Sequence, residues 1–311
     1  MLSSDDDHSR PFFVVGCPRS GTTLLRMMLD GHPRLAIPDE SHFVLGLAPR
    51  WWVRRRVVLD DLLRHPKVLA WDVDPGALAA EARTRHPRSY AEQVAAVFSA
   101  YARLRGKSRW GDKTPGYVSH VETLARLFPD AQFVHVIRDG REVARSLSDW
   151  SWGSRTAITG AFWWAHKVRV GRRVGRRLGR DRYVEVRFDA LLARPEDELR
   201  RLCSFLGESY SEEMLDYPDR LVGDRRPIKA QDLHLVEPPT PGLREWRAGL
   251  STSDQRAVEQ VCRRTLRELG YQVGPSSLPA WVRALVVRGG DLAVTGWSDV
   301  RARLSPATRE F

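Results

Sequence analysis

The apolar positions of this chain form short continuous runs that alternate with longer segments of helical spacing. The runs lie at Phe12–Val15, Leu35–Ile37 and Gln132–Ile137, and each predicts a strand; the mixed segment Arg182–Phe188 predicts another. The run at 132–137 is continuous, as is typical of a strand buried inside a parallel sheet.

Apolar residues three and four positions apart predict the helices. Their spacing indicates a helix that begins at Thr22. It indicates six more helices, at Ser89–Arg105, Tyr117–Phe128, Gly140–Trp150, Ala157–Leu178, Pro195–Leu206 and Ser253–Leu269. Ser89 is predicted to cap its helix, with Val94, Val97, Phe98 and Tyr101 facing inward. The segments Arg109–Pro115 and Arg220–Pro241 are predicted to be loops.

Strands that alternate with helices predict an α/β fold of three layers, in which helices cover both faces of a central, P-loop-like parallel sheet. With 311 residues the chain can bury one large core, so we expect a disordered tail at 1–10 and a single domain over 11–311. Residues 43–88 predict helical fragments interrupted by prolines at 49, 66, 75 and 87. This insertion is either a lid over a substrate or a helical cap with a solvated basic face.

The segment from Phe12 to Asp30 predicts a strand, a glycine-bounded loop and a helix in succession. Such a loop directs backbone N–H groups and a helix N-terminus at one anion. Gly16 and Gly21 have nearly the spacing of a P-loop, but Thr22 stands where a nucleotide-hydrolysing P-loop has lysine. The cation is instead Arg19, whose guanidinium grips phosphate oxygens as a fork and never deprotonates. The loop is therefore predicted to hold a phosphate without hydrolysing a nucleotide.

A second predicted anion site follows the strand at 132–137. Arg138 stands where that strand ends and a helix begins, and Ser146 comes about two helical turns later. A structural turn at Arg138–Asp139 is the simpler alternative, as a plain strand-to-helix turn is for the first loop. Two such sites, each between a strand and a helix, fit one ligand with phosphates at both ends, and we expect them to share a cavity.

Composition and charge narrow the choice of partner only slightly. A net charge of +11, from 50 basic and 39 acidic residues, suits a polyanionic ligand, nucleic acid or an anionic membrane surface. Three distant cysteines, Cys17, Cys203 and Cys262, predict free thiols in a reducing compartment. The acidic first ten residues predict no signal peptide, and no apolar stretch approaches the roughly 20 residues that span a bilayer. We expect a cytoplasmic protein without stable membrane insertion.

The segment Pro18–Leu24 resembles the 5′-phosphosulfate-binding loop of sulfotransferases that use 3′-phosphoadenosine 5′-phosphosulfate (PAPS). The stretch Arg26–Pro33 and the triplet Asp39–Ser41 are most similar to the tyrosylprotein sulfotransferase branch and its bacterial relatives. The likeness covers Pro11–Glu40 and Trp110–Leu147, and fainter parts lie at Tyr183–Leu206 and Pro238–Gly270.

This resemblance implies a transferase that moves a sulfuryl group from PAPS to a hydroxyl or phenol of a peptide or small molecule, releasing 3′,5′-adenosine bisphosphate (PAP). It implies no metal, and the sequence shows no His/Cys/Asp cluster at ligand spacing. The animal enzymes of that branch are Golgi membrane proteins, whereas no such anchor is visible here, so we expect a bacterial protein. A homodimer is left open.

The resemblance also implies roles for individual residues in binding the donor. The 5′-phosphate would be held by the loop residues Arg19, Ser20, Gly21, Thr22 and Thr23, and the 3′-phosphate by Arg138 and Ser146. Phe188 matches a family aromatic expected to stack on adenine. Glu237 and Pro238 stand near the place where the tyrosylprotein branch has a lysine, so Arg244 is a candidate substitute.

For the chemistry, Glu40 matches the catalytic glutamate that takes the acceptor's proton, and Lys113 matches a lysine placed against the bridging oxygen. His42 and His32 are alternative bases, because other sulfotransferases use histidine. We expect partial desolvation to raise the pKa of Glu40 toward that of a useful base. A loop lysine that is merely solvated is the alternative for Lys113.

Two other functions compete with this one. A P-loop kinase of small molecules predicts lysine at position 22 and a magnesium-binding acid directly after a strand, where the chain has Thr22 and Arg138. A nucleic-acid-binding protein would use the +11 charge and the basic stretch Arg169–Arg182, but no recognised nucleic-acid-binding module is visible. We therefore expect no nucleic-acid partner.

Overall fold

The computed structural model describes residues 10–48, 58–149, 154–217 and 246–290. The chain forms two compact units, which are described one at a time. The first comprises Met1–Gly16, Ser20–Ile137 and Val170–Pro241, and the second comprises Cys17–Arg19, Arg138–Arg169 and Gly242–Phe311. The predicted tail apart from Arg10, the predicted loop at 220–241 and Arg244 lie outside the described residues. The single domain over 11–311 stays a prediction.

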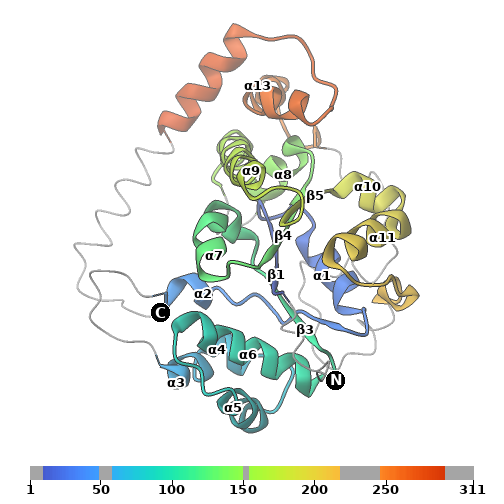
Figure 1. Cartoon of the computed structure of the whole chain (residues 1–311). Helices are drawn as coiled ribbons and strands as arrows, with labels where there is room; N and C mark the ends of the chain where they lie inside the picture. The colour runs from blue at the N-terminus through green and yellow to red at the C-terminus, as the bar shows by residue number, and fades with distance from the viewer. Residues whose placement is uncertain (1–9, 49–57, 150–153, 218–245, 291–311) are drawn as a thin grey trace, which may run out of the picture. The chain divides into compact units, whose positions relative to one another are not determined.

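A five-stranded parallel sheet forms the centre of the first unit (Figure 1). Along the sheet the strands follow the order β2 (Leu35–Ala36), β3 (Arg109–Lys113), β1 (Phe12–Gly16), β4 (Gln132–Ile137) and β5 (Tyr183–Arg187). Val14 of β1 is in register with Lys113 of β3 and with Val134 of β4. All neighbouring strands are parallel, so their carboxyl ends lie along one edge of the sheet. The predicted α/β fold with a parallel sheet is confirmed.

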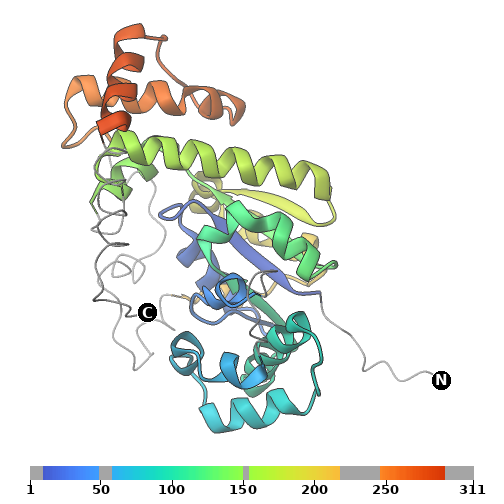
Figure 2. The same cartoon turned by 90° about the vertical axis from the view of Figure 1, so that its left-hand side faces the viewer.

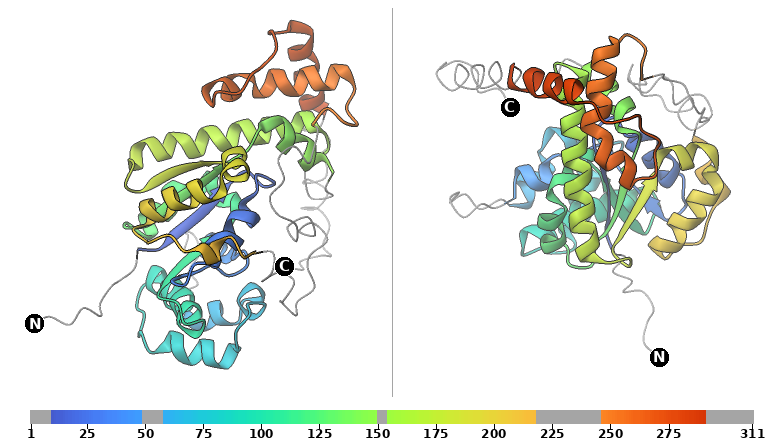
Figure 3. Two further views of the ribbon diagram at one scale, coloured as in Figure 1. Left: turned by 90° about the vertical axis from the view of Figure 1, so that its right-hand side faces the viewer. Right: turned by 90° about the horizontal axis from the view of Figure 1, so that it is seen from above.

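Helices cover both faces of this sheet because successive strand residues point to opposite sides. Phe13 and Val15 of β1 are buried on one face, in a cluster that includes residues of α6 (Tyr90–Leu104), η1 (Pro115–His120) and α7 (Val121–Leu127). Phe12 and Val14 are buried on the other face, with residues of α1 (Thr22–Asp30), α10 (Phe188–Ala193) and α11 (Pro195–Leu206). Figure 3 shows α11 in gold beside α1 in blue. Each such fully buried side chain contributes about 1.5–3 kcal/mol to folding.

Four short helices occupy the described part of the predicted insertion: α2 (Phe43–Gly46), α3 (Leu59–Leu63), α4 (Pro66–Leu69) and α5 (Pro75–Arg83). The predicted breaks at Pro66 and Pro75 are confirmed, because α3 and α4 end before these prolines and each proline begins the next helix, α4 or α5. Proline suits the first helical position because its missing N–H would have no partner there. Leu62 and Leu78 are buried in the same core as α6, beside which α5 lies in Figure 2. Residues 49–57 lie outside the described residues.

The predicted cap of α6 is confirmed. The Ser89 hydroxyl accepts a hydrogen bond from the Glu92 N–H (3.2 Å), and the Glu92 carboxylate accepts from the Ser89 N–H (3.3 Å). This reciprocal arrangement satisfies two N–H groups that the helix leaves unpaired. The predicted inward residues are all buried: Val94, Val97, Phe98 and Tyr101.

The prediction of a polar loop at Arg109–Pro115 is wrong, because residues 109–113 form β3 and all five are buried. The polar side chains of β3 have hydrogen-bonding partners. Arg109 donates to Oε1 of Gln132 (2.6 Å) and to the carbonyl of Arg10 (2.8 Å). A polar sequence can therefore form an inner strand when each buried polar group is hydrogen-bonded. The helix α10 was also absent from the prediction, which ended a strand at Phe188.

The second unit contains α8 (Gly140–Ser148), residues 157–169 of α9 (Ala157–Leu178), α13 (Thr252–Glu268) and helical residues 278–290. The predicted start of α13 at Ser253 is wrong, because Ser251 is the cap and its hydroxyl accepts from the Asp254 N–H (3.1 Å). Arg141 of α8 forms an ion pair with Glu259 of α13 (2.8 Å).

The three cysteines are buried free thiols, as predicted. In the part of the chain that the structure describes, no helix combines the length and the apolar character needed to cross a membrane.

Candidate active site

The loop between β1 and α1 has a backbone that its two glycines make possible. A Cβ atom on Gly16 would lie 2.7 Å from the carbonyl oxygen of Val136 on β4. Gly21 has a φ of +90°, and a Cβ atom there would lie 2.1 Å from the ring of Phe188. Arg19 also has a positive φ, +72°, which costs a residue other than glycine about 1–3 kcal/mol. Such strain is found where a loop serves a ligand.

The same loop carries a buried polar atom that the described protein leaves unsatisfied. Ser20 is fully buried, and its hydroxyl has no hydrogen-bonding partner among the described residues. The helix α1 begins directly afterwards at Thr22, with no side-chain cap on its first N–H groups. An unsatisfied hydroxyl beside uncapped helix N–H groups suits an anion. The loop therefore fits the 5′-phosphate of the donor that the resemblance implies.

In the second unit the structure joins Arg19 to the other predicted anion site. Nε of Arg19 donates to the Ser146 hydroxyl (3.1 Å), although the two residues are 127 positions apart. Arg138 precedes α8, and its Nε lies 2.6 Å from Oε2 of Glu142 in the first turn of that helix. The ring of Trp164 packs on Gly140, where a Cβ atom would lie 2.3 Å from the ring, and its Nε1 donates to the Arg138 carbonyl (3.1 Å). Trp164 thus fixes the backbone at the start of α8.

In the first unit the predicted base and the predicted lysine form an ion pair. Nζ of Lys113 lies 2.6 Å from Oε1 of Glu40, and Nε2 of His42 lies 3.0 Å from Oε2 of the same carboxylate. Nζ of Lys113 is also 3.4 Å from the hydroxyl of Thr23 on α1. The side chain of Lys113 is 5% exposed and that of Glu40 is 33% exposed. Lys113 is therefore a buried strand residue between the carboxylate and the phosphate loop, not a solvated loop lysine.

The pKa of Glu40 moves in the direction opposite to the one expected. Burial raises this pKa, but the hydrogen bond with His42 and the charge of Lys113 outweigh burial and lower the pKa to about 2. Burial lowers the pKa of Lys113, and the charge of Glu40 opposes that effect. The expectation that desolvation makes Glu40 more basic is wrong for this arrangement, because the hydrogen bond with His42 and the charge of Lys113 favour the carboxylate.

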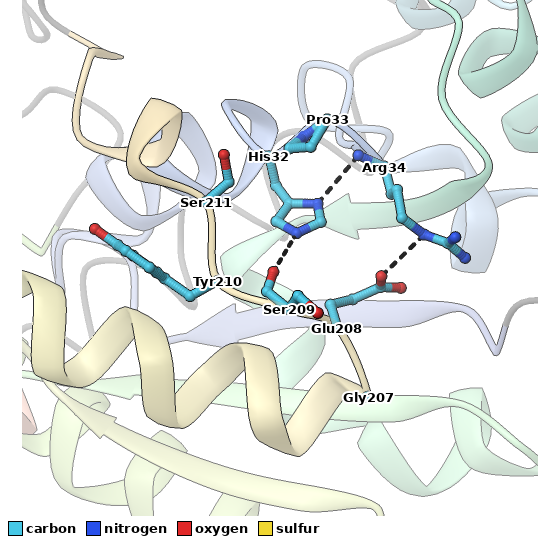
Figure 4. Close-up of a pocket in the computed structure, with 8 residues that line it drawn as sticks. All are labelled: His32, Pro33, Arg34, Gly207, Glu208, Ser209, Tyr210 and Ser211. Atoms are coloured by element: carbon cyan, nitrogen blue, oxygen red, sulfur yellow. Dashed lines mark hydrogen bonds and ion pairs between the residues drawn. The ribbon is translucent and has the colours of Figure 1, made fainter.

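His32, the other alternative base, has both ring nitrogens engaged away from Glu40. Its Nδ1 accepts from the Arg34 N–H (3.1 Å), so its Nε2 donates to the Ser209 carbonyl (2.7 Å), as Figure 4 shows. It lines a pocket of about 490 Å³, beside an ion pair between Arg34 and Glu208 (3.0 Å). His32 links the end of α1 to the segment after α11. Phe188, expected at adenine, is buried against Gly21 of the loop.

A buried hydrogen-bonded cluster adjoins the Glu40–Lys113 pair, and the sequence did not indicate it. The Ser41 hydroxyl donates to Oδ2 of Asp112 (3.0 Å), and the Thr114 hydroxyl donates to Oδ1 (3.2 Å). Burial raises the pKa of Asp112 to about 7, against the effect of these hydroxyl groups. The only sequence signal is that Ser41 and Asp112 directly neighbour the two candidate residues. Among the described residues, no group of three His, Cys, Asp or Glu side chains is placed to hold a metal ion.

A parallel sheet with helices on both faces places the protein among the α/β proteins. Within that class, the chain belongs to the sulfotransferase family. The family model, described as "Sulfotransferase family", matches residues 11–212.

Curated relatives support the same family. Protein-tyrosine sulfotransferase 2 of Gallus gallus is 27% identical over 226 residues, which are 68% of this chain and 54% of that protein. The protein-tyrosine sulfotransferase of Drosophila melanogaster is 27% identical over 219 residues, 67% of this chain and 40% of that protein. Nodulation protein NoeE of Sinorhizobium fredii is 29% identical over 298 residues, 84% of this chain and 65% of that protein. The chain thus spans about half the length of the first two relatives.

Two solved structures show the fold. The sulfotransferase domain of the Synechococcus PCC 7002 olefin synthase has a TM-score of 0.59 and 24% identity, covering 88% of this chain and 100% of that one. The sulfotransferase domain from the curacin biosynthetic pathway has a TM-score of 0.60 and 19% identity, covering 85% of this chain and 98% of that one. At these identities the likeness concerns the fold alone.

Proposed function

We propose that this protein transfers a sulfuryl group from PAPS to a hydroxyl or phenol acceptor by in-line displacement. The observation that carries the proposal is the hydrogen bond between Arg19 and Ser146, because it joins one residue predicted at the 5′-phosphate to one residue predicted at the 3′-phosphate. A donor with phosphates at both ends of an adenosine needs such a pair of sites. Membership of the sulfotransferase family and the unsatisfied hydroxyl of Ser20 support the same donor.

In this proposal the donor supplies the sulfuryl group and the leaving bisphosphate, and the protein supplies fixed positive charge around them. Ser20, Gly21, Thr22 and Thr23 offer hydroxyl and N–H groups to the 5′-phosphate, with Arg19 beside them. Arg138 and Ser146 hold the 3′-phosphate, and Phe188 supports the loop on which the nucleotide rests. Fixed cations stabilise charge that develops on the leaving group without reorganising during the reaction. They do the work that magnesium does in nucleotide hydrolysis.

Glu40 takes the proton of the acceptor hydroxyl in this proposal, and Lys113 links that step to the donor. With a pKa of about 2, Glu40 is ionised but a weak base. Lys113 also reaches Thr23 at the end of the proposed phosphate loop, so its positive charge would attract an anion bound at that loop as well as the Glu40 carboxylate. As Lys113 turns toward the bridging oxygen, Glu40 loses part of its stabilising cation and becomes more basic. Proton removal is thereby coupled to the presence of the donor.

The acceptor class follows from the relatives only in outline. Two of them are named for protein tyrosine, so a tyrosine peptide is one proposed acceptor, and a small phenol or alcohol is the other. The helices α2 to α5 after Glu40 are the proposed acceptor cover. A small-molecule kinase is not favoured, because Thr22 occupies the position of the P-loop lysine.

Transfer of radiolabelled sulfate from PAPS to p-nitrophenol and to a tyrosine-containing peptide tests the proposal. Calorimetric titration with PAP, with and without EDTA, measures donor-site binding independently of the acceptor. We expect PAP to bind equally well in EDTA, Arg19→Ala to weaken it at least 10-fold, and Arg19→Lys to retain part of the affinity. A protein that binds ATP only with magnesium and ignores PAP would overturn the proposal in favour of a kinase.

A further inference from the structure

We propose that Ser41 and Asp112 are positioning residues for the transfer reaction, because their hydrogen bond fastens the loop that carries Glu40 to the strand that carries Lys113. The inference rests on the proposed function, since it concerns the geometry of the base in that reaction. Neither residue is proposed to touch the acceptor or the donor.

Two contacts join the same two short segments. Glu40 pairs with Lys113 (2.6 Å), and the next residue of the loop, Ser41, donates to the preceding residue of the strand, Asp112 (3.0 Å). Neighbouring residues of an extended strand point to opposite sides of its backbone, so Asp112 and Lys113 leave β3 in opposite directions. The loop that carries Glu40 therefore cannot move away from Lys113 as a rigid body unless the buried bond between Ser41 and Asp112, on the other side of β3, also breaks.

The second contact is far better shielded from water than the first. Ser41 and Asp112 are fully buried and Thr114 is 1% exposed, whereas the Glu40 side chain is one-third exposed. The Ser41 hydroxyl also lies 3.3 Å from the hydroxyls of Thr114 and Tyr117. Burying a carboxyl among neutral hydroxyls costs free energy that an apolar cluster would avoid. A closed polar network of this kind specifies one arrangement of the segments that it joins.

The backbone of the loop that carries Glu40 also needs a contact that holds it in place. His42, which follows Ser41 and holds the second oxygen of Glu40, has a φ of +54°. A residue other than glycine stays in that region only when surrounding contacts hold it there, because the conformation costs about 1–3 kcal/mol. The bond from Ser41 to Asp112 is the buried contact next to this residue. It thus supports both partners of the Glu40 carboxylate, Lys113 on the strand and His42 on the loop.

The experiment compares Ser41→Ala and Asp112→Ala, which each remove the bond, with two matched variants. Ser41→Thr keeps the hydroxyl. Tyr90→Phe removes a partly buried hydroxyl that donates to the Phe43 or Val44 carbonyl (3.2 and 2.8 Å), which destabilises the same segment without touching the proposed bond. Three quantities are measured: kcat and KM with the better acceptor of the panel, the Kd for PAP, and the pKa of Glu40 by carboxyl ¹³C NMR without donor.

We expect Ser41→Ala and Asp112→Ala to lower kcat about 10-fold while KM and the Kd for PAP stay within about twofold. The pKa of Glu40 should rise from about 2 by about one unit or more as Lys113 and His42 move away from its carboxylate. The double variant should be no worse than either single one, because both remove the same bond. Ser41→Thr should restore most of kcat, and Tyr90→Phe should change neither kcat nor the pKa of Glu40.

An unchanged kcat together with an unchanged Glu40 pKa in folded Ser41→Ala would overturn the inference, and so would additive losses in the double variant. If Asp112→Ala does not fold, Ser41→Ala and its threonine control decide alone. Failure of the proposed function has a different signature: a wild-type protein that neither binds PAP nor transfers sulfate. The NMR measurement needs no donor, so it tests the positioning of Glu40 in either case.

Discussion

Two carboxylates at the end of β3 experience opposite environments. Glu40 is partly exposed, hydrogen-bonded to His42 and paired with the charge of Lys113, so its pKa falls to about 2 although burial alone would raise it. Asp112 is fully buried and hydrogen-bonded to hydroxyls, so burial dominates and its pKa rises to about 7. The comparison shows that a nearby cation and hydrogen-bond donor can keep a partly buried carboxylate ionised, whereas full burial among neutral hydroxyls raises the pKa. The ionised one is the proposed base, and the other is proposed to hold it in place.

The largest effect should come from removing the ionised carboxylate. Glu40→Gln keeps the shape of the side chain but cannot accept a proton, so kcat should fall about 10²–10⁴-fold while the Kd for PAP stays within about twofold. Radiolabel transfer and calorimetry measure the two quantities. Asp39→Asn, which alters the neighbouring carboxylate, is the control and should lower kcat less than about threefold. Glu40→Gln with undiminished kcat would assign the proton transfer to another residue.

Removing the cation should turn Glu40 into an ordinary carboxylate. In Lys113→Met the pKa of Glu40 should rise from about 2 toward the usual value near 4.3, because its main attractive charge is gone. His42→Gln, which keeps a hydrogen-bond donor, should raise that pKa less. Carboxyl ¹³C NMR over pH 2 to 7 measures the pKa of Glu40 in both variants. A Glu40 pKa that stays near 2 in Lys113→Met would break the electrostatic explanation.

The buried carboxyl should make stability depend on pH in the opposite sense from Glu40. Asp112 has a raised pKa in the folded state, so its contribution is complete below about pH 4 and is lost as pH rises through about 7. Glu40 has a lowered pKa, so its contribution is complete above about pH 4 and is lost as pH falls through about 2.

Urea unfolding at pH 4.5 and pH 7 separates these two contributions. Between those values Asp112 should lower the free energy of unfolding by about 1–3 kcal/mol, and Asp112→Asn should abolish that slope. Glu122→Gln, a change at an exposed residue of α7, is the control and should leave the slope intact. If Asp112→Asn kept the wild-type slope, another group would be the source of the pH dependence.

The smallest effect should come from the edge of the buried cluster. Tyr117→Phe removes one hydroxyl, 3.3 Å from that of Ser41, and leaves the bond from Ser41 to Asp112 intact. We expect the free energy of unfolding to fall by about 0.5–1.5 kcal/mol, with kcat unchanged. Urea unfolding and the transfer assay provide the two values. A large loss of kcat in this variant would mean that Tyr117, like Ser41 and Asp112, is a positioning residue.

The predictable parts of the fold were those with a strong local pattern. The apolar runs of β1 and β4 and the spacing in α6, α9 and α11 were enough to place these elements. β3 was missed because Arg109, Asp112 and Lys113 make its sequence polar, and their partners come from distant parts of the chain. The start of α13 was predicted at Ser253, one residue late, because Ser251 and Ser253 lie close together and only the bond to the Asp254 N–H shows which serine caps the helix. Local patterns cannot show which of two similar groups finds a partner.

In the candidate site, too, the sequence indicated some residues but not the contacts between them. The loop motif indicated Arg19 and the residues after it, and the family resemblance indicated Glu40 and Lys113. Nothing in the sequence indicated that Lys113 and Glu40 would form an ion pair, and the expected direction of the Glu40 pKa shift was wrong for that reason. Asp112 was not singled out, because a carboxylate beside a lysine usually lies in solvent.

Short-range patterns in the sequence were enough to predict the types of element and the local chemistry, because a strand, a glycine-bounded loop and a helix depend on residues close together in the chain. Which side chains meet depends on the folding of the whole chain. Glu40 and Lys113 are 73 positions apart, Ser41 and Asp112 are 71 apart, and Arg19 and Ser146 are 127 apart. Within the sheet, β3 lies between β1 and β2 although it follows both in the chain. The order of the strands, which no local pattern encodes, brings residues so far apart in sequence into contact.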